Sequence, residues 1–203
     1  MRVSRAEAKE RNRQALIEAA RHLVARDGHR ARLDEIAERA GLTTGAVYSL
    51  FGSKNGLLIA LVTHHLAPHY DGIGHAVPPE LDLLDAVDAF ARHYRRTCDD
   101  PDALRELSFE LSLQDAALRD PDLRTRLAAV RSHEERLTDL FTGRRHHGAT
   151  LTRPQAHRLA IALRGLLTGL SQAVVLGLTD TADEQYAAET ARALATPAVL
   201  GPA

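Results

Sequence analysis

The sequence predicts an all-α protein, in which a three-helix domain at the N-terminus precedes a larger helical domain. Apolar residues recur at helical spacing along most of the 203 residues, and no run alternates polar and apolar residues over the length of a strand. Hydrophobic residues make up 44% of the chain, which is enough for a core, but aromatic residues make up only 4% and tryptophan is absent. The core must therefore rely on Leu and Ala, which favour helices.

A stretch rich in Pro and Gly, APHYDGIGHAVPPE at residues 67–80, predicts the domain boundary. We therefore expect a first domain at 1–66 and a second at 67–203. The first holds eleven Lys and Arg against seven Asp and Glu, whereas the second holds fifteen against twenty. This asymmetry places positive potential on the N-terminal part, where the phosphates of DNA would be attracted.

The first expected helix covers residues 10–26, with Leu16 and Leu23 on one apolar face, and Gly28 follows its end. Residues 1–9 before it are polar and carry three basic side chains. These residues either form an arm that orders on contact with phosphate or a minor groove, or they are a frayed tail.

Residues 33–61, LDEIAERAGLTTGAVYSLFGSKNGLLIAL, predict three short helices with two tight joints. Gly41 ends the first helix, because Gly accepts the left-handed conformation common at a helix C-terminus. Thr43 and Ser53 are good N-caps for the second and third helices. Two short helices joined by a Gly-containing turn form a helix-turn-helix, which fits the DNA major groove. The alternative is a plain three-helix core whose Gly and Thr serve only as turn residues.

The second of these helices, residues 44–50, favours DNA contact because its side chains are small and uncharged. The small residues are Thr43, Thr44, Gly45, Ala46 and Ser49. They allow the backbone to approach base edges, and the hydroxyls with the helix N-terminus are able to bind phosphate. Tyr48 adds a hydroxyl on an apolar ring, and Lys54 is placed for a contact to the DNA backbone.

The segment resembles the DNA-binding signature of TetR-family transcriptional regulators over roughly residues 9–62. The matching positions are Ile36-Ala37, Ala40-Gly41, Thr43, Gly45, Tyr48, Phe51 and Ser53-Lys54. The resemblance implies that Thr43, Thr44, Gly45, Tyr48 and Lys54 lie at the DNA, with Ser49 and Leu50 nearby. The chain departs from the family at Arg32, where a Thr or Ser cap is usual, and at Leu50, where His or Tyr is usual. Arg32 implies a weaker helix start or an added phosphate contact.

The second domain reads as helical throughout. The expected helices cover residues 81–97, 101–117, 121–142, 154–177 and 184–195, with a loop at 143–150. Asp100-Pro101 and Asp120-Pro121 each combine an N-cap with Pro at the first helical position, and residues 181–184 read as a capping box.

The helix at 154–177 is apolar nearly all round, which predicts that more than one side is buried. Gly165 and Gly169 lie one turn apart beside Leu166 and Leu170, so another helix is able to approach closely there. We expect this strip to be a dimer interface, and the resemblance agrees, because the family dimerises through its last two helices. A fully buried helix inside a monomer is the alternative.

The resemblance also implies a pocket for a small-molecule effector in the second domain. Candidate lining residues are aromatic or apolar, with one histidine: Phe90, Tyr94, Phe109, Leu113 and His133. Histidines also gather near the domain boundary, and His65 and His69 would share a face if their helix continued. We favour surface histidines over a metal pair there, because Pro68 is expected to break the helix and no further ligand is evident.

No nucleophile–base, zinc or phosphate-loop motif is present, so we expect no enzyme activity and no cofactor. A single cysteine, no apolar leader and no run of eighteen apolar residues favour the cytoplasm. The sequence therefore predicts a homodimeric, ligand-responsive repressor that binds a palindromic double-stranded operator and leaves it when a small molecule binds. The alternatives are an activator of the same fold, a small-molecule- or metal-binding helical protein with a vestigial helix-turn-helix, and an interaction module that uses the helix-turn-helix against protein.

Overall fold

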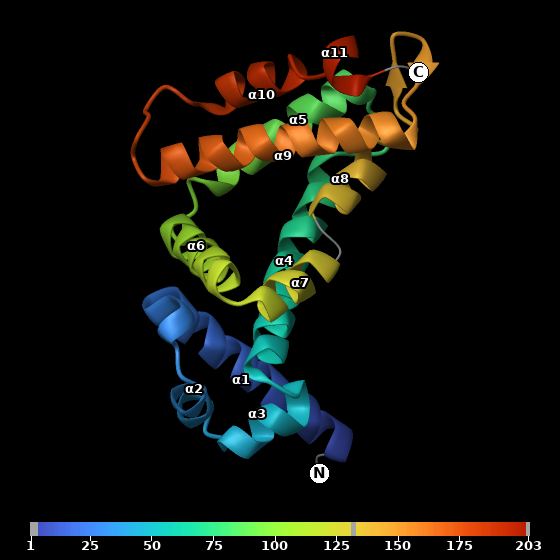
Figure 1. The fold of residues 1–203 in the computed structure, drawn as a ribbon. Helices are drawn as coiled ribbons and strands as arrows, with labels where there is room; N and C mark the ends of the chain where they lie inside the picture. Colours follow the sequence, from blue (N-terminus) through green and yellow to red (C-terminus); the bar gives the residue numbers. More distant parts are fainter. Residues whose placement is uncertain (1–3, 131–132, 202–203) are drawn as a thin grey trace. The chain divides into compact units, whose positions relative to one another are not determined.

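The computed structural model describes residues 4–130 and 133–201, and it confirms the all-α class (Figure 1). The chain forms two compact units: residues 1–69 with 105–130, and residues 70–104 with 131–203. We call these the N-terminal unit and the C-terminal unit. The N-terminal unit takes segments from both sides of residue 66, whereas the C-terminal unit lies wholly after it, and the predicted division at residue 66 remains a prediction.

The N-terminal unit is built from helices around one apolar core. Its elements are α1 (Arg5–Asp27), η1 (Gly28–Arg30), α2 (Leu33–Arg39), α3 (Thr44–Phe51), the first part of α4 (Lys54–Ala76), most of α6 (Ala103–Arg119) and α7 (Pro121–Ala129). The core joins Leu16 of α1, Ile36 of α2, Val47 of α3, Leu57 of α4 and Phe109 of α6, each at most 1% exposed. The short helices α2 and α3 are therefore held by the longer helices of the unit.

The C-terminal unit is also helical and has its own core. Its elements are the end of α4, α5 (Leu83–Thr97), α8 (His133–Phe141), β1 (Arg145–His146), β2 (Ala149–Thr150), α9 (Arg153–Val175), α10 (Glu184–Arg192) and α11 (Pro197–Leu200). Figure 1 shows α5, α9 and α10 side by side. Phe90, Phe141, Leu159 and Leu163 fill the space between them, and each is at most 1% exposed.

The first helix starts five residues before the predicted position. Ser4 and Glu7 form a capping box, in which the Ser4 hydroxyl accepts from the Glu7 N–H at 3.1 Å and Glu7 accepts from the Ser4 N–H at 2.7 Å. These bonds satisfy N–H groups that would otherwise lack partners, so α1 extends to Arg5. Arg5 and Lys9 of the expected arm are therefore helical, and Arg2 lies outside the described residues.

The prediction that Pro68 breaks the helix is wrong, because α4 is one helix from Lys54 to Ala76. Proline removes one backbone hydrogen bond, but Ile73 and Val77 beyond it are buried in the core of the C-terminal unit. Burial of these residues compensates for the missing bond. His65 and His69 thus share one helix, and their side chains lie outside the described part of the structure.

Three local predictions after residue 120 also need correction. The helix expected at 121–142 is two helices, because Val130 has an extended backbone that ends α7. The loop at 143–150 contains the antiparallel pair β1–β2, which turns at His147 and Gly148 with positive φ at both, a conformation suited to a tight hairpin. Asp183 rather than Thr181 caps α10, since its carboxylate accepts from the Tyr186 N–H at 2.7 Å.

Candidate DNA interface

The turn between α2 and α3 is fixed by hydrogen bonds at both helix ends. After α2 the Leu42 N–H donates to the Ala37 carbonyl at 2.8 Å, and the Gly41 N–H donates to the Glu38 carbonyl at 2.9 Å. This pair is a Schellman motif, which requires the positive φ of 67° that Gly41 adopts. The Thr43 hydroxyl then accepts from the Ala46 N–H at 3.3 Å and starts α3. The predicted roles of Gly41 and Thr43 in the turn are confirmed.

One side of α3 is buried and the other is open. Val47 is fully buried in the core of the N-terminal unit, while Gly45, Tyr48 and Ser49 are exposed, as is the cap Thr43. Tyr48 is 55% exposed, which is unusual for a residue with a large apolar ring in a well-packed unit. Of the residues of α3 and its cap predicted to lie at the DNA, Thr43, Gly45, Tyr48 and Ser49 are therefore exposed, whereas Thr44 and Leu50 are half-buried.

Gly45 leaves room on this open side. A Cβ added to Gly45 would meet only the Thr43 hydroxyl, at an ordinary 3.7 Å. No packing within the chain thus requires glycine at this position. Its absence of a side chain instead allows another molecule to approach the α3 backbone closely.

The joint between α3 and α4 depends on a glycine that the sequence prediction did not single out. The Ser53 hydroxyl accepts from the Gly56 N–H at 3.0 Å, as expected of the predicted cap. A Cβ on Gly56 would stand 2.0 Å from the Phe51 carbonyl oxygen, so only glycine fits. Phe51 is also covered by the Arg13 guanidinium of α1, 5.0 Å above the ring centre, in a cation–π contact. Glycine is required at position 56 because the backbone lies so close to the Phe51 carbonyl. The spacing of residues in the sequence does not reveal this contact.

The two basic residues predicted at the DNA are both engaged within the chain. Arg32 stands at the N-cap of α2 without capping it, as its sequence implied, and pairs with Asp34 at 2.6 Å. The Lys54 ammonium donates to the Ala31 carbonyl at 2.5 Å, and partial burial lowers the pKa of this lysine. A phosphate contact from either residue remains a prediction. Such a contact would compete with these bonds.

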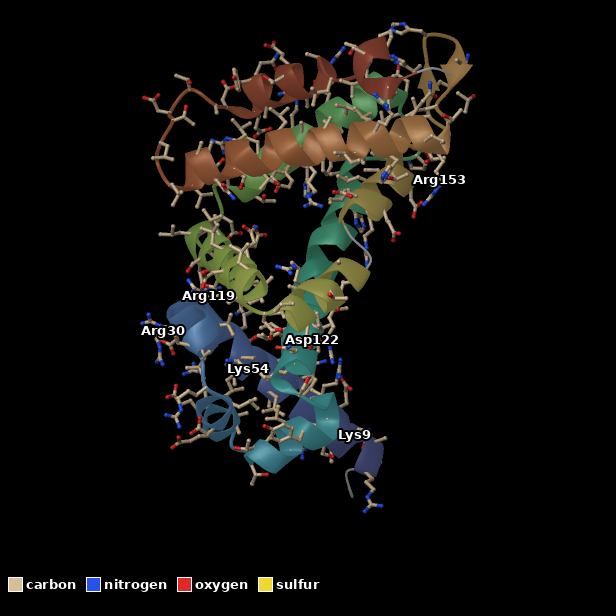
Figure 2. The ribbon with its side chains drawn as sticks, in the orientation of Figure 1. Lys9, Arg30, Lys54, Arg119, Asp122 and Arg153 are labelled. Atoms are coloured by element: carbon tan, nitrogen blue, oxygen red, sulfur yellow. The ribbon has the colours of Figure 1, made fainter. Side chains whose placement is uncertain are left out.

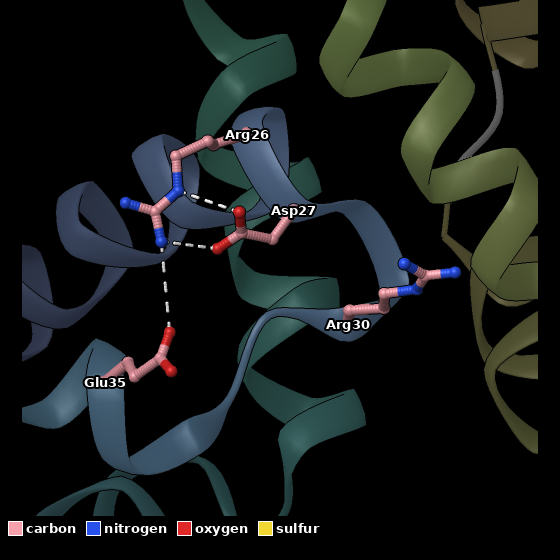
Figure 3. Close-up of a pocket in the computed structure, with 4 residues that line it drawn as sticks. All are labelled: Arg26, Asp27, Arg30 and Glu35. Carbon is pink, nitrogen blue, oxygen red and sulfur yellow. Dashed lines mark hydrogen bonds and ion pairs between the residues drawn. The ribbon is translucent and has the colours of Figure 1, made fainter.

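A shallow, polar hollow of about 610 Å³ lies beside the end of α1, lined by Arg26, Asp27, Arg30 and Glu35 (Figure 3). Arg26 holds both carboxylates, at 2.6 Å from Asp27 and 3.9 Å from Glu35. The hydrogen bond from Arg26 lowers the pKa of Asp27, and the same bond raises the pKa of Arg26. The charges of this hollow largely compensate one another, so it gives little reason to bind an anion.

The predicted effector residues lie in two different cores. Phe90 is 1% exposed in the C-terminal unit, 6.0 Å from the Tyr94 ring and 6.0 Å from the Phe141 ring. Phe109 and Leu113 are buried in the N-terminal unit. The side chain of His133 lies outside the described part. The structure thus brings Phe90 and Tyr94 together, and separately Phe109 and Leu113.

The predicted dimer strip lies on an open face of α9. Gly165 and Gly169 are exposed, and a Cβ on either would meet nothing within 4 Å. Leu166 and Leu170 beside them are half-buried, and Ile161 one turn earlier is 48% exposed. The strip is therefore available to a second molecule, and its use as a dimer interface remains a prediction.

By length and composition α9 is also apolar enough to cross a membrane, with mean hydropathy 1.2 in its most apolar window. Leu159, Leu163 and Leu167 on its inner face are at most 1% exposed, in the core of the C-terminal unit. A core helix of a helical bundle passes the same test, and this packing accounts for the apolar residues of the inner face, while 22% of the window is buried.

Comparison with known proteins matches residues 16–61 to the family described as bacterial regulatory proteins, tetR family. The HTH-type transcriptional activator FasR of Mycolicibacterium smegmatis is 38% identical over 85 residues, which are 40% of this chain. The match covers only 39% of the length of FasR. The word activator is part of the name of FasR, and it does not assign an activity to this chain.

Solved structures extend the likeness over the whole fold. A TetR-family member from Streptomyces coelicolor is 25% identical, with a TM-score of 0.66 over 90% of this chain and 97% of its own. The multidrug-binding protein EbrR, solved with proflavin, is 24% identical, with a TM-score of 0.63 over 90% of this chain and 99% of its own. These matches include the helical C-terminal part.

The family model covers α2, the turn, α3 and the start of α4, the elements that present the open face of Tyr48. The structural matches add the larger helical part, and the family consists of regulators rather than enzymes. Residues 16–61 therefore match the tetR family of bacterial regulatory proteins, and the whole chain has the fold of solved TetR-family members.

Proposed function

We propose that this chain is a homodimeric repressor that binds a palindromic operator through α3 and leaves it when a small molecule binds. The open face of α3 carries the proposal, because Tyr48, Gly45 and Ser49 lie exposed on a short helix held rigidly by capped ends. Such a helix presents its N-terminal residues to base edges in the major groove, while hydroxyls and backbone N–H groups position it on phosphates.

Dimerisation follows from the geometry of recognition. Two copies joined at the exposed strip of α9, around Gly165 and Gly169, would present two α3 helices to two half-sites. Half-sites of a palindrome lie about 34 Å apart, or a multiple of that distance. The family tendency to pair through the last helices supports this arrangement.

The likeness to EbrR supports the proposed release by an effector. EbrR, a protein of this fold, binds proflavin, so the fold can accommodate a small organic molecule. An effector weakens DNA binding only to the extent that it binds the non-operator geometry more tightly. We expect the regulator to act in the cytoplasm, where the chromosome lies.

A transcriptional activator is the second candidate, and the name of FasR supports it. Repressor and activator differ in where the operator lies relative to the promoter, not in how α3 meets DNA. A promoter fused to a reporter gene, with the operator in its natural position, separates them. Deletion of the regulator raises expression for a repressor and lowers it for an activator.

Selection of genomic fragments by the purified chain tests the proposal. We expect the bound fragments to share a palindrome, and Tyr48→Ala to lose them while remaining folded. Leu118→Ala is the control, because Leu118 is 75% exposed on α6 and lies outside the recognition helix. Fragments without a common sequence, or equal enrichment by Tyr48→Ala, would contradict the proposal.

A further inference from the structure

The first half of α1 carries a row of basic side chains. Arg5, Lys9 and Arg13 follow one another at intervals of four residues, so they lie on one side of the helix, which we call the basic side of α1. Arg5 and Lys9 are exposed and Arg13 is half-buried, and Figure 2 labels Lys9 on this part of α1. Among the residues that the structure describes, no carboxylate forms an ion pair with any of the three.

The basic side of α1 continues directly into the core of the N-terminal unit. Leu16, Ala20 and Leu23 follow Arg13 in steps of three and four residues, and each is at most 5% exposed. The same core holds Val47 of α3. The basic residues therefore lie on the side of α1 that faces the helix-turn-helix, beyond the point where the apolar core ends.

Arg13 places this basic side next to α3. Its guanidinium lies over the Phe51 ring, 5.0 Å from the ring centre. Phe51 is the last residue of α3 and stands three positions after the exposed Tyr48, so the two are neighbours on the helix surface. The basic side of α1 thus adjoins the open face of α3.

The stacked guanidinium keeps its hydrogen-bonding edge available. In a cation–π contact an arginine uses the face of its planar group, while its five N–H donors point outward in the plane. Within the described part of the chain, no group accepts a hydrogen bond from Arg13. The ring of Phe51 therefore holds a cation whose donors match the paired oxygens of a phosphate.

The charges around this row favour an anionic partner. Residues 5–13 hold four basic side chains and two acidic ones, an excess of two positive charges. The acidic pair is bonded elsewhere, since Glu7 accepts from the Ser4 N–H at 2.7 Å and Glu10 accepts from the Gln14 amide at 2.7 Å. The backbone of duplex DNA is a polyanion, and it flanks any helix that enters the major groove.

We propose that the basic side of α1, with Arg13 as its anchor, binds the phosphate backbone of the half-site that α3 reads. This surface deepens the proposed function and rests on it, because α3 has to meet duplex DNA. Phosphate contacts fix the register and orientation of a recognition helix but carry no sequence information. Arg13 was not among the residues that the sequence placed at the DNA.

Binding to a duplex of random sequence tests this surface, because such DNA contains no operator. The full-length chain is titrated from ~50 to ~200 mM salt, and each phosphate contact adds ~0.9 to the slope of log affinity against log salt. Arg13→Gln should reduce the slope by that amount, which corresponds to an affinity roughly eightfold lower at ~0.1 M salt.

Three further variants separate a phosphate contact from a structural role. Arg13→Lys keeps the charge, so the slope should return toward that of the unchanged protein. Lys9→Gln should also lower the slope by ~0.9, and packing cannot be the cause because Lys9 is exposed and outside the Phe51 contact. Arg11→Gln is the matched control: it removes the same charge from an exposed position roughly 200° around α1 from Arg13, so the slope should stay unchanged.

An unchanged slope for Arg13→Gln and Lys9→Gln, or an equal decrease for Arg11→Gln, would overturn the proposal. The same holds if the chain binds no random duplex at ~50 mM salt. A lower operator affinity of Arg13→Gln without a change of slope would show that Arg13 only supports Phe51, and it too would overturn the contact. The proposed function fails differently: operator and random DNA would bind equally, while Arg13→Gln would still lower the slope.

Discussion

Asn55 and Asp120 lie 65 residues apart in the sequence, yet the Asn55 amide donates to the Asp120 carboxylate at 2.9 Å. The same amide donates to Asp122 at 3.0 Å. Asn55 belongs to the first turn of α4, shortly after α3, and the two aspartates lie at the start of α7. This contact joins the helix-turn-helix to α7 within the N-terminal unit.

The Asn55 contact predicts a pH dependence of stability. Its hydrogen bonds are the main cause of the lowered pKa of both Asp120 and Asp122. A carboxyl whose folded-state pKa is lowered stabilises the fold fully above its unfolded pKa of about 4, and this contribution is lost as the pH falls through the folded value. Asn55→Ala should therefore lower the free energy of unfolding at pH 7 and reduce its further loss on acidification.

Urea unfolding from pH 7 to pH 3 measures this effect. Asn12→Ala is the control, because Asn12 lies on α1 and takes no part in this contact. An Asn55→Ala profile parallel to that of the unchanged protein would contradict the role assigned to Asn55.

The sequence predicted the helix-turn-helix well because its signals are local. Gly41, Thr43 and Ser53 each fix a backbone conformation or a cap within a few residues, and the structure has all three as expected. The bond from Asn55 to Asp120 has no local signal, since it depends on helices distant in sequence.

Two glycines, Gly45 and Gly56, should respond in opposite ways to the same substitution. Gly56→Ala forces a Cβ to 2.0 Å from the Phe51 carbonyl oxygen, so we expect a loss of about 2 kcal/mol in unfolding free energy. Gly45→Ala meets no such obstacle, and the better helix propensity of alanine should stabilise the protein by up to about 1 kcal/mol. Thermal or urea unfolding compares the two.

Gly45→Ala also tests the approach of DNA to α3. Because this variant remains folded, a lower operator affinity would come from the methyl group at the interface. Operator affinity equal to that of the unchanged protein would show that DNA does not approach the α3 backbone at Gly45.

Arg144 should be a large contributor to the stability of the C-terminal unit. It is 7% exposed, and its guanidinium donates to the carbonyls of Leu140, Pro78 and Leu81 at 2.7 to 3.0 Å. Arg144→Met removes these three hydrogen bonds in a buried site, so we expect a loss of about 3 kcal/mol in unfolding free energy. Arg145→Met, at an exposed neighbour, should change it by less than about 0.5 kcal/mol.

The surroundings of Arg144 explain why its importance could not be predicted from the sequence. The sequence analysis predicted only a loop at 143–150, and most arginines are solvated, so Arg144 was not singled out. Its burial depends on carbonyl groups at the ends of other helices, which a single sequence does not place. For the same reason Phe90 and Phe109 looked like partners in one pocket, although they lie in separate cores.

Gly169→Leu should convert the proposed dimer to a monomer. The exposed position leaves room for leucine within the chain, so the variant should fold, and the side chain would obstruct only a closely packed partner. Gly74→Leu is the matched control, because Gly74 is also exposed, and an added Cβ there meets nothing within 4 Å. Sedimentation should give half the mass for Gly169→Leu alone; an unchanged mass would exclude this face as the interface.

Specific recognition of DNA by α3 is the central claim, and titration of operator against random DNA over a range of salt concentrations tests it most directly. We expect operator affinity to exceed random affinity by at least ~10³ at physiological salt, and both to fall steeply as salt rises. Tyr48→Ala should reduce the operator affinity toward the random value. Equal affinity for the two DNAs, with no effect of Tyr48→Ala, would contradict the assignment of α3 as the recognition helix.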